Sequence, residues 1–173
     1  MSDYEIRRCI QADAATVARH RVEMFREMGD VPTDELARDL LEKSTSALAA
    51  CLAAGTYVGW FAIDSNDTVI AGAGVHVKPQ LPRISHDHLR VDDTPVPLAV
   101  NVYTQIQWRG KGVARALMRV LMDWATEQGA DCVVLHASEA GRPLYESLGF
   151  SPTNEMRWFV PGVGRRGTIK PQT

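Results

Sequence analysis

One short run constrains this chain more than any other. Residues 107–118 read Gln-Trp-Arg-Gly-Lys-Gly-Val-Ala-Arg-Ala-Leu-Met. An apolar, β-branched segment (96–104) precedes the run and predicts a strand, while residues 113–128 have the spacing of an amphipathic helix. A glycine turn from a strand into a helix leaves backbone N–H groups free at the positive end of the helix dipole. Such turns bind phosphate oxygens, so we expect this run to hold a pyrophosphate.

Three kinds of phosphate loop have to be compared with this run. A Walker A loop needs Ser or Thr after its lysine, but Lys111 is followed by Gly112. A dinucleotide fingerprint needs a third glycine where Arg115 stands. The third pattern, Gln/Arg-x-x-Gly-x-Gly/Ala, is met at every position by residues 109–114. In this pattern the run resembles the acyl-coenzyme A loop of the GCN5-related N-acetyltransferase (GNAT) family.

A second stretch supports the same resemblance. Residues 143–150 read Pro-Leu-Tyr-Glu-Ser-Leu-Gly-Phe and look like the second GNAT signature, a helix that carries Leu-Tyr and ends in Gly-Phe. Gly149 is typical of a left-handed residue that closes a helix, with Phe150 as the apolar contact after it. Alone, Tyr145 would be a half-buried aromatic residue of an amphipathic helix. The two signatures together favour a catalytic role for it.

The remaining chain predicts alternating strands and helices. The strands are expected at 4–8, 57–63, 69–77, 96–104, 131–137 and 155–160, and the helices at 13–29, 33–54, 113–128 and 139–148. The tight turn 64–67 implies an antiparallel meander, and the later helices imply at least one parallel crossover. We therefore expect an α/β (α+β) fold, with a mixed, mostly antiparallel sheet flanked by helices.

The order β-α-α-β-β-β-α-β-α-β is also the GNAT order, and the resemblance is most specific over residues 101–150. We expect one N-acetyltransferase domain over residues 1–160 and a loose tail over 161–173, which is rich in Gly, Arg and Pro. Residues 78–95 are polar, contain three prolines and show no periodicity. They predict a long loop, and long loops in compact domains are often functional.

Composition limits the partners and the compartment. A net charge of −2 without a polybasic run gives no reason to expect nucleic acid. The N-terminus lacks a signal-peptide layout, and no stretch approaches the ~18 apolar residues of a membrane span. Cys9, Cys51 and Cys132 are odd in number and far apart, which favours free thiols in a cytoplasmic protein. His86 and His88 do not have metal-ligand spacing, so no metal is expected.

The resemblance implies the chemistry: an acetyl-CoA-dependent N-acetyltransferase that moves an acetyl group directly to a primary amine of a small molecule. The departing thiolate benefits from an acid that keeps its proton at neutral pH, and a tyrosine hydroxyl with a pKa of about 10 fits. The resemblance assigns this role to Tyr145. The acetyl-CoA-binding residues that it implies are Val102, Tyr103, Thr104, Arg109, Gly110, Lys111, Gly112, Val113, Ala114, Arg115 and Ser138.

Several of these assignments have ordinary structural alternatives. The segment from Val102 to Thr104 can equally be a buried strand, because the implied contacts are main-chain. Arg109 either contacts phosphate or braces the turn, while Lys111 and Arg115 either contact the outer phosphates or are solvated charges at a helix end. Ser138 stands where the family often has Asn, and a serine hydroxyl can still donate a hydrogen bond. Ile106 replaces a common proline, which we interpret as harmless.

No general base stands out in the sequence. Glu23, His76 and His136 are candidates, and a surface or satisfied structural role is the simpler interpretation of each. Asn101, next to the cofactor strand, is a candidate to orient substrate or water. A base that acts through water is therefore the default hypothesis.

Two other functions stay open. A protein acetyltransferase acting on an α-amino group or a lysine would need an open groove beside the strand 96–104. A non-catalytic acyl-CoA sensor would need no catalytic tyrosine. The acceptor cannot be named from the sequence, because a fold indicates a reaction class and not a substrate. Trp158 and Phe159 on the expected terminal strand suggest either the edge of a homodimer or alternation into the core.

Overall fold

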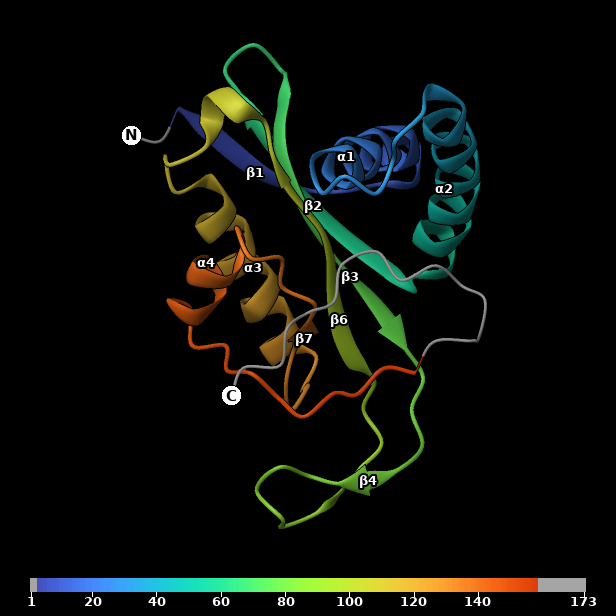
Figure 1. The fold of residues 1–173 in the computed structure, drawn as a ribbon. Helices are drawn as coiled ribbons and strands as arrows, with labels where there is room; N and C mark the ends of the chain where they lie inside the picture. The colour runs from blue at the N-terminus through green and yellow to red at the C-terminus, as the bar shows by residue number, and fades with distance from the viewer. Residues whose placement is uncertain (1–2, 159–173) are drawn as a thin grey trace.

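The computed structural model describes residues 3–158, which form one five-stranded sheet in the order β1-β2-β3-β6-β7 (Figure 1). The strands are β1 (Tyr4–Arg8), β2 (Tyr57–Asp64), β3 (Val69–Lys78), β6 (Val96–Thr104) and β7 (Val134–Leu135). All neighbours pair antiparallel except β6 and β7, which are parallel. The expected mixed, mostly antiparallel sheet flanked by helices is therefore confirmed.

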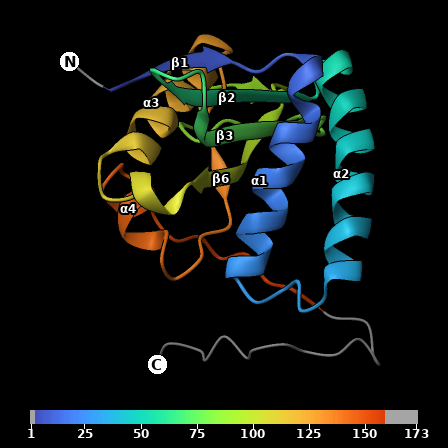
Figure 2. The ribbon, with the colours of Figure 1, turned by 90° about the horizontal axis from the view of Figure 1, so that it is seen from above.

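The helices cover both faces of the sheet. Helices α1 (Ala14–Glu27) and α2 (Asp34–Ala54) lie on one side of the strands, and α3 (Val113–Glu127) and α4 (Arg142–Glu146) lie on the other (Figure 2). A short 3₁₀ turn, η1 (Gln11–Asp13), precedes α1. The predicted boundaries of α2 are confirmed: the Thr33 hydroxyl accepts the Leu36 N–H at 3.2 Å, and Gly55 closes the helix at φ +70°. No helix within residues 3–158 is both long and apolar enough to cross a membrane.

The core lies on both faces of β2 and β3. Because successive side chains of a strand point to opposite faces, β2 contributes to two clusters and is buried along almost its whole length. Val58, Trp60 and Ala62 pack toward α3, where Leu117 and Leu121 are fully buried. Tyr57, Phe61 and Ile63 pack with α1 and α2. The middle of the sheet is therefore packed on both faces, and it supports the strand β6 at its edge.

The C-terminal elements are shorter than predicted. The strand expected at 131–137 is only Val134–Leu135. It is an edge strand whose one neighbour in the described sheet is β6, and the two strands pair at only two positions. The helix expected at 139–148 is only Arg142–Glu146, which begins beside Pro143 and is followed by Gly149 at φ +92°.

The predicted strand at 155–160 is wrong over residues 155–158, which form no strand, and its last two residues lie outside the described part of the chain. Trp158 is 77% exposed, so it is not in the core, while Phe159 lies outside the described residues. The tail 161–173 also lies outside them. The homodimer stays a prediction.

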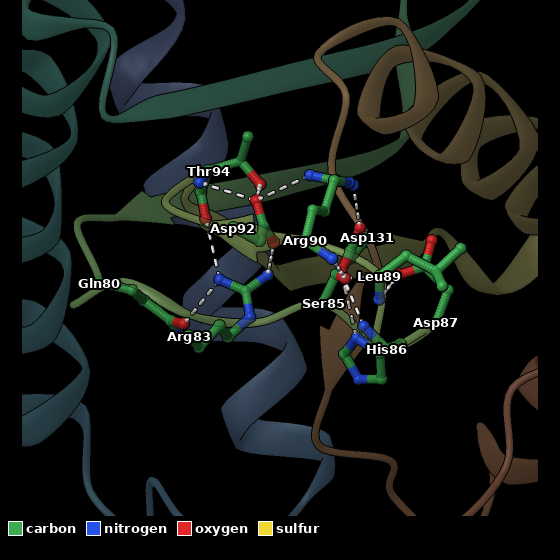
Figure 3. A network of polar contacts seen from close by, with 10 residues as sticks. All are labelled: Gln80, Arg83, Ser85, His86, Asp87, Leu89, Arg90, Asp92, Thr94 and Asp131. Carbon is green, nitrogen blue, oxygen red and sulfur yellow. Dashed lines mark hydrogen bonds and ion pairs between the residues drawn. The ribbon is translucent and has the colours of Figure 1, made fainter.

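The segment 78–95, predicted as a loop without structure, contains a small hairpin of β4 (Arg83–Ile84) and β5 (Val91–Asp92) that projects beyond the end of the sheet (Figure 1). The buried Asp92 carboxylate accepts hydrogen bonds from Arg83 and from the Thr94 hydroxyl (Figure 3). Arg90 donates to Asp131 at 2.6 Å, so the hairpin is also tied to the turn before β7. Sequence periodicity could not find it, because these bonds, rather than an apolar stripe, hold it together.

Tyr57 lies across Gly74, and a methyl group at that position would overlap the tyrosine hydroxyl. We expect Gly74→Ala to lower the free energy of unfolding by about 1–3 kcal/mol, because overpacking forces the ring to move. Gly72→Ala is the matched control: its added carbon would lie 3.1 Å from the Phe61 ring, so a small adjustment suffices. Urea unfolding of both variants checks this, and equal losses would contradict it.

Candidate active site

The sheet opens between β6 and β7. The two strands pair only at Leu98–Val134 and Ala99–Leu135. From Val100 to Thr104, no strand among residues 3–158 pairs with this edge of β6. An unpaired strand edge presents backbone N–H and C=O groups that a ligand can bind. The open edge is therefore the first component of a candidate site.

A β-bulge lies at the start of this open edge. Gly74 faces Val100 and Gly72 faces Tyr103, so two residues of β6, Asn101 and Val102, stand opposite one residue of β3. Asn101 has φ +55°, a left-handed conformation that asparagine tolerates better than most residues. Bulges redirect side chains and end regular pairing, and they are common next to active sites.

The Asn101 side chain is held firmly. It is 6% exposed, its Oδ1 accepts a hydrogen bond from Arg21 Nη1 at 2.8 Å, and its Nδ2 donates to the Tyr57 hydroxyl at 3.3 Å. Burial raises the pKa of Tyr57, so this hydroxyl is neutral and can accept the bond. The bulge is thus fixed by one residue of α1 and one of β2.

The glycine run forms the turn that the sequence predicts. A 3₁₀ turn, η2 (Ile106–Trp108), follows β6, and Gly110 and Gly112 then adopt φ +73° and +80° before α3 begins. Gly112 occupies the N-cap position, so no side chain caps the first turn of α3. Its N–H groups are therefore available to an anion, at the positive end of a 15-residue helix.

A cavity of about 430 Å³ connects this turn with the end of β6. Its lining residues come from the strand end, the glycine turn, the start of α3 and α4: Thr104, Trp108, Arg109, Gly110, Gly112, Val113, Ala114, Arg115, Pro143, Leu144 and Ser147. The strand end and the loop that follows it thus meet the second motif, which comes much later in the sequence, around one space. Its size is typical of a small-molecule site.

Arg109 acts as a brace in this structure. Its Nε donates to the Thr104 carbonyl at 2.9 Å, and its Nη2 donates to both carboxylate oxygens of Glu27 at 2.7 Å. These bonds tie the loop to β6 and to the end of α1.

The other charged side chains of the loop have ordinary partners. Lys111 lies 4.8 Å above the Trp108 ring, and Arg115 donates to the Ser147 hydroxyl at 2.8 Å. Ser138 accepts the Gly141 N–H at 3.2 Å just before α4. Of these three residues, Arg115 alone lines the cavity.

Tyr145 is half-buried and does not itself line the cavity. Its neighbours Leu144 and Ser147 line the cavity, while its own ring packs against Phe150, with the ring centroids 6.0 Å apart. Its hydroxyl has no hydrogen-bond partner among residues 3–158. Burial raises its pKa, so the hydroxyl keeps its proton at neutral pH.

Comparison with known proteins identifies this arrangement. The model of the Acetyltransferase (GNAT) family matches residues 19–150, which include both signatures and the open edge.

The chain belongs to the GNAT acetyltransferase family.

It is therefore an N-acetyltransferase, as the sequence predicted. It is 34% identical to a GCN5-related N-acetyltransferase from Ralstonia eutropha, whose solved structure superposes with a TM-score of 0.79 and covers 92% of this chain and 99% of that one.

Two other relatives extend the comparison. A predicted acetyltransferase from Clostridium acetobutylicum, solved with acetyl-CoA, is 24% identical and shares the fold at a TM-score of 0.77, covering 91% of this chain and 96% of that one. An aminoglycoside N(6′)-acetyltransferase type 1 from Stenotrophomonas maltophilia is 29% identical over 164 residues, which cover 89% of this chain and 90% of that protein.

The GNAT fold brings most of the predicted residues together. Thr104 and the loop residues other than Lys111 share the cavity, and Val102 lies in the bulge. The Thr104 hydroxyl oxygen is buried and has no hydrogen-bond partner in the described chain. Such an orphaned polar atom is expected where a ligand completes the site.

The candidate bases do not converge on the bulge. Glu23 lies 3.5 Å from Arg26, His136 lies 3.6 Å from Glu155, and His76 faces Tyr57 and Leu98 in the sheet. His20, which the sequence did not single out, packs against Tyr103, and burial lowers its pKa to about 4. It is therefore neutral at neutral pH. Within residues 3–158, no group of three or more His, Cys, Asp or Glu side chains is placed to hold a metal.

The sequence missed two kinds of residue. Trp108, Pro143, Leu144 and Ser147 line the cavity, and their positions within or beside the two signatures were a usable signal. Arg21 and Tyr57 gave no signal, because they reach Asn101 from 80 and 44 residues away in sequence.

Proposed function

We propose that this GNAT protein transfers an acetyl group directly from acetyl-CoA to a primary amine of a small molecule. One observation carries the proposal: a single cavity joins the uncapped start of α3 to the end of β6, where the strand edge is open. A phosphate-binding turn and a free strand edge are the two parts needed to hold a nucleotide-linked acyl group. The Clostridium acetobutylicum structure with acetyl-CoA, which has the same fold, supports this donor.

The residues present fit acetyl-CoA. The backbone of residues 110–115 would hold the pyrophosphate through N–H groups, because Gly110 and Gly112 leave open space where side chains would stand. The edge of β6 from Val102 to Thr104 would bind the pantetheine arm, with Ser138 as a further hydrogen-bond partner. Arg115 and Lys111 would add positive charge near the phosphates, while Arg109 keeps the turn in place.

The reaction forms a C–N bond and breaks a C–S bond. An alkylamine has a pKa of about 10, so it must lose a proton before it can attack, and we propose that water near Asn101 takes this proton. Backbone N–H groups at the bulge would stabilise the negative charge that develops on the carbonyl oxygen. The sulfur leaves with the bonding electron pair and receives a proton from Tyr145, which regains one from solvent. Burial of Tyr145 suits this step, since its raised pKa keeps the proton available.

The Stenotrophomonas maltophilia relative supports a small-molecule amine as acceptor, because that protein is an aminoglycoside N(6′)-acetyltransferase and the match covers nearly the whole of both chains. We expect the enzyme to act in the cytoplasm, where acetyl-CoA is available.

The decisive experiment measures CoA release from acetyl-CoA with a panel of amines, amino acids, aminoglycosides and peptides, against a background without acceptor. Turnover with a small amine supports the proposal. Turnover with peptides alone would indicate a protein acetyltransferase. Binding of acetyl-CoA with no turnover on any acceptor would indicate a non-catalytic sensor.

Gly112→Asp should abolish acetyl-CoA binding, because it places a carboxylate where the phosphates are expected to lie. Gly112→Asn is the matched control: it has nearly the same shape and tolerates the left-handed conformation, but adds no charge. Isothermal titration with acetyl-CoA should show at least a tenfold larger loss of affinity for Asp than for Asn. Equal losses would show that the backbone conformation alone matters and would argue against a phosphate at this turn.

Tyr145→Phe should lower kcat by about a hundredfold or more while leaving the affinity for acetyl-CoA nearly unchanged, because only a proton transfer in the transition state is lost. Steady-state kinetics and titration of both proteins check this. Leu148→Met, a volume-conserving change in the same segment, is the control for packing. An unchanged kcat for Tyr145→Phe would remove Tyr145 from the mechanism.

A further inference from the structure

Arg21 is a cation beside the bulge of the candidate site. It lies on the side of α1 that faces β6, its Nη1 donates to Asn101 at 2.8 Å, and its guanidinium carbon lies 4.7 Å from the centre of the Phe25 ring. Asn101 is the bulge residue, next to the point where β7 leaves β6. Arg21 therefore reaches the place where the transfer is proposed.

This guanidinium has no carboxylate partner among residues 3–158. Burial lowers the pKa of Arg21, which reflects the cost of holding its charge away from water. A half-buried cation without a counter-ion is expected where a ligand supplies the negative charge.

The acidic side chains nearby are already engaged. Glu27 pairs with Arg109 at 2.7 Å, and Glu23 lies 3.5 Å from Arg26. Asp34, at the start of α2, also bonds Arg26, at 2.9 Å. In the part of the chain that the structure describes, α1 thus offers the bulge one guanidinium without a carboxylate partner and no carboxylate that lacks a basic partner. This charge pattern suits an acceptor with an anionic group better than a polycation.

We propose that the acceptor is an amine that carries a carboxylate a few bonds from the reacting nitrogen, as an amino acid does, and that Arg21 binds this carboxylate. Arginine presents five N–H donors, one of which bonds Asn101, so its remaining donors can form paired bonds to a carboxylate. Because the same guanidinium holds Asn101, the carboxylate would lie close to the bulge, which fixes the distance between the anchored group and the attacking amine. The carboxylate is unchanged by the reaction. This inference rests on the proposed function.

The experiment compares matched acceptors: several L-amino acids, their carboxamides, the corresponding amines without a carboxyl group, and an aminoglycoside, which has several amino groups and no carboxylate. The wild-type enzyme should show a kcat/KM at least tenfold higher for the amino acids than for their carboxamides. Arg21→Gln should lower kcat/KM for the amino acids about ten- to a hundredfold more than for the carboxamides, because both acceptors lose the bond that holds Asn101 but only the amino acids lose a charge-assisted bond. Arg21→Lys keeps the charge without the paired donors, so its kcat/KM for the amino acids should fall between those of the wild-type enzyme and Arg21→Gln.

Arg19→Gln is the control, because Arg19 lies on the same helix, is exposed and bonds only Thr16 in the described chain; it should leave the preference unchanged. The ratio between acid and carboxamide separates recognition from a structural role. Equal losses for both acceptors in Arg21→Gln would mean that Arg21 only positions Asn101, and would overturn this inference while leaving the proposed function intact. A wild-type preference for carboxamides or aminoglycosides would do the same. No CoA release with any acceptor would overturn both.

Discussion

The candidate site depends on one constraint: β6 has a neighbour along most of one edge but along only two residues of the other. A strand in the middle of a sheet normally satisfies both edges with protein. From Val100 onward no described strand pairs with the second edge, and at Asn101 a bulge interrupts the pairing with β3 on the first edge. The cavity and the glycine turn lie at the end of this open edge, and the proposed acceptor contact lies at its start.

The sequence predicted the parts of the site whose signals are local. The glycine turn was predictable because Gly110 and Gly112 must adopt positive φ between a strand and a helix, and both do. Thr33 and Gly55 marked the ends of α2 for the same reason, since a cap is decided within a few residues. The paired signatures at 109–114 and 143–150 then gave the family, and with it the order of the strands.

Contacts between distant segments were not predictable. Nothing about Arg21 in the sequence indicates Asn101, 80 residues away, because hydrogen bonds between side chains leave no periodicity. The length of β7 depends on which strand stands beside it, and the hairpin at 83–92 depends on a buried Asp92 with arginine partners. Asn101 itself was identified as a candidate, but its left-handed backbone could be learned only from the register of β3 and β6. In each case the missing information is three-dimensional.

The bond between Arg109 and Glu27 has a consequence for how this enzyme can diversify. It joins the glycine turn to Glu27, the last residue of α1, and α1 also carries Arg21. Substitutions in the loop and in α1 therefore share a mechanical link and should not combine additively. New acceptor preferences would then arise most readily from changes at side chains alone, or from paired replacements at positions 27 and 109. A lineage that alters one partner first must pass through an intermediate with a loosened loop, which narrows the evolutionary routes open to this site.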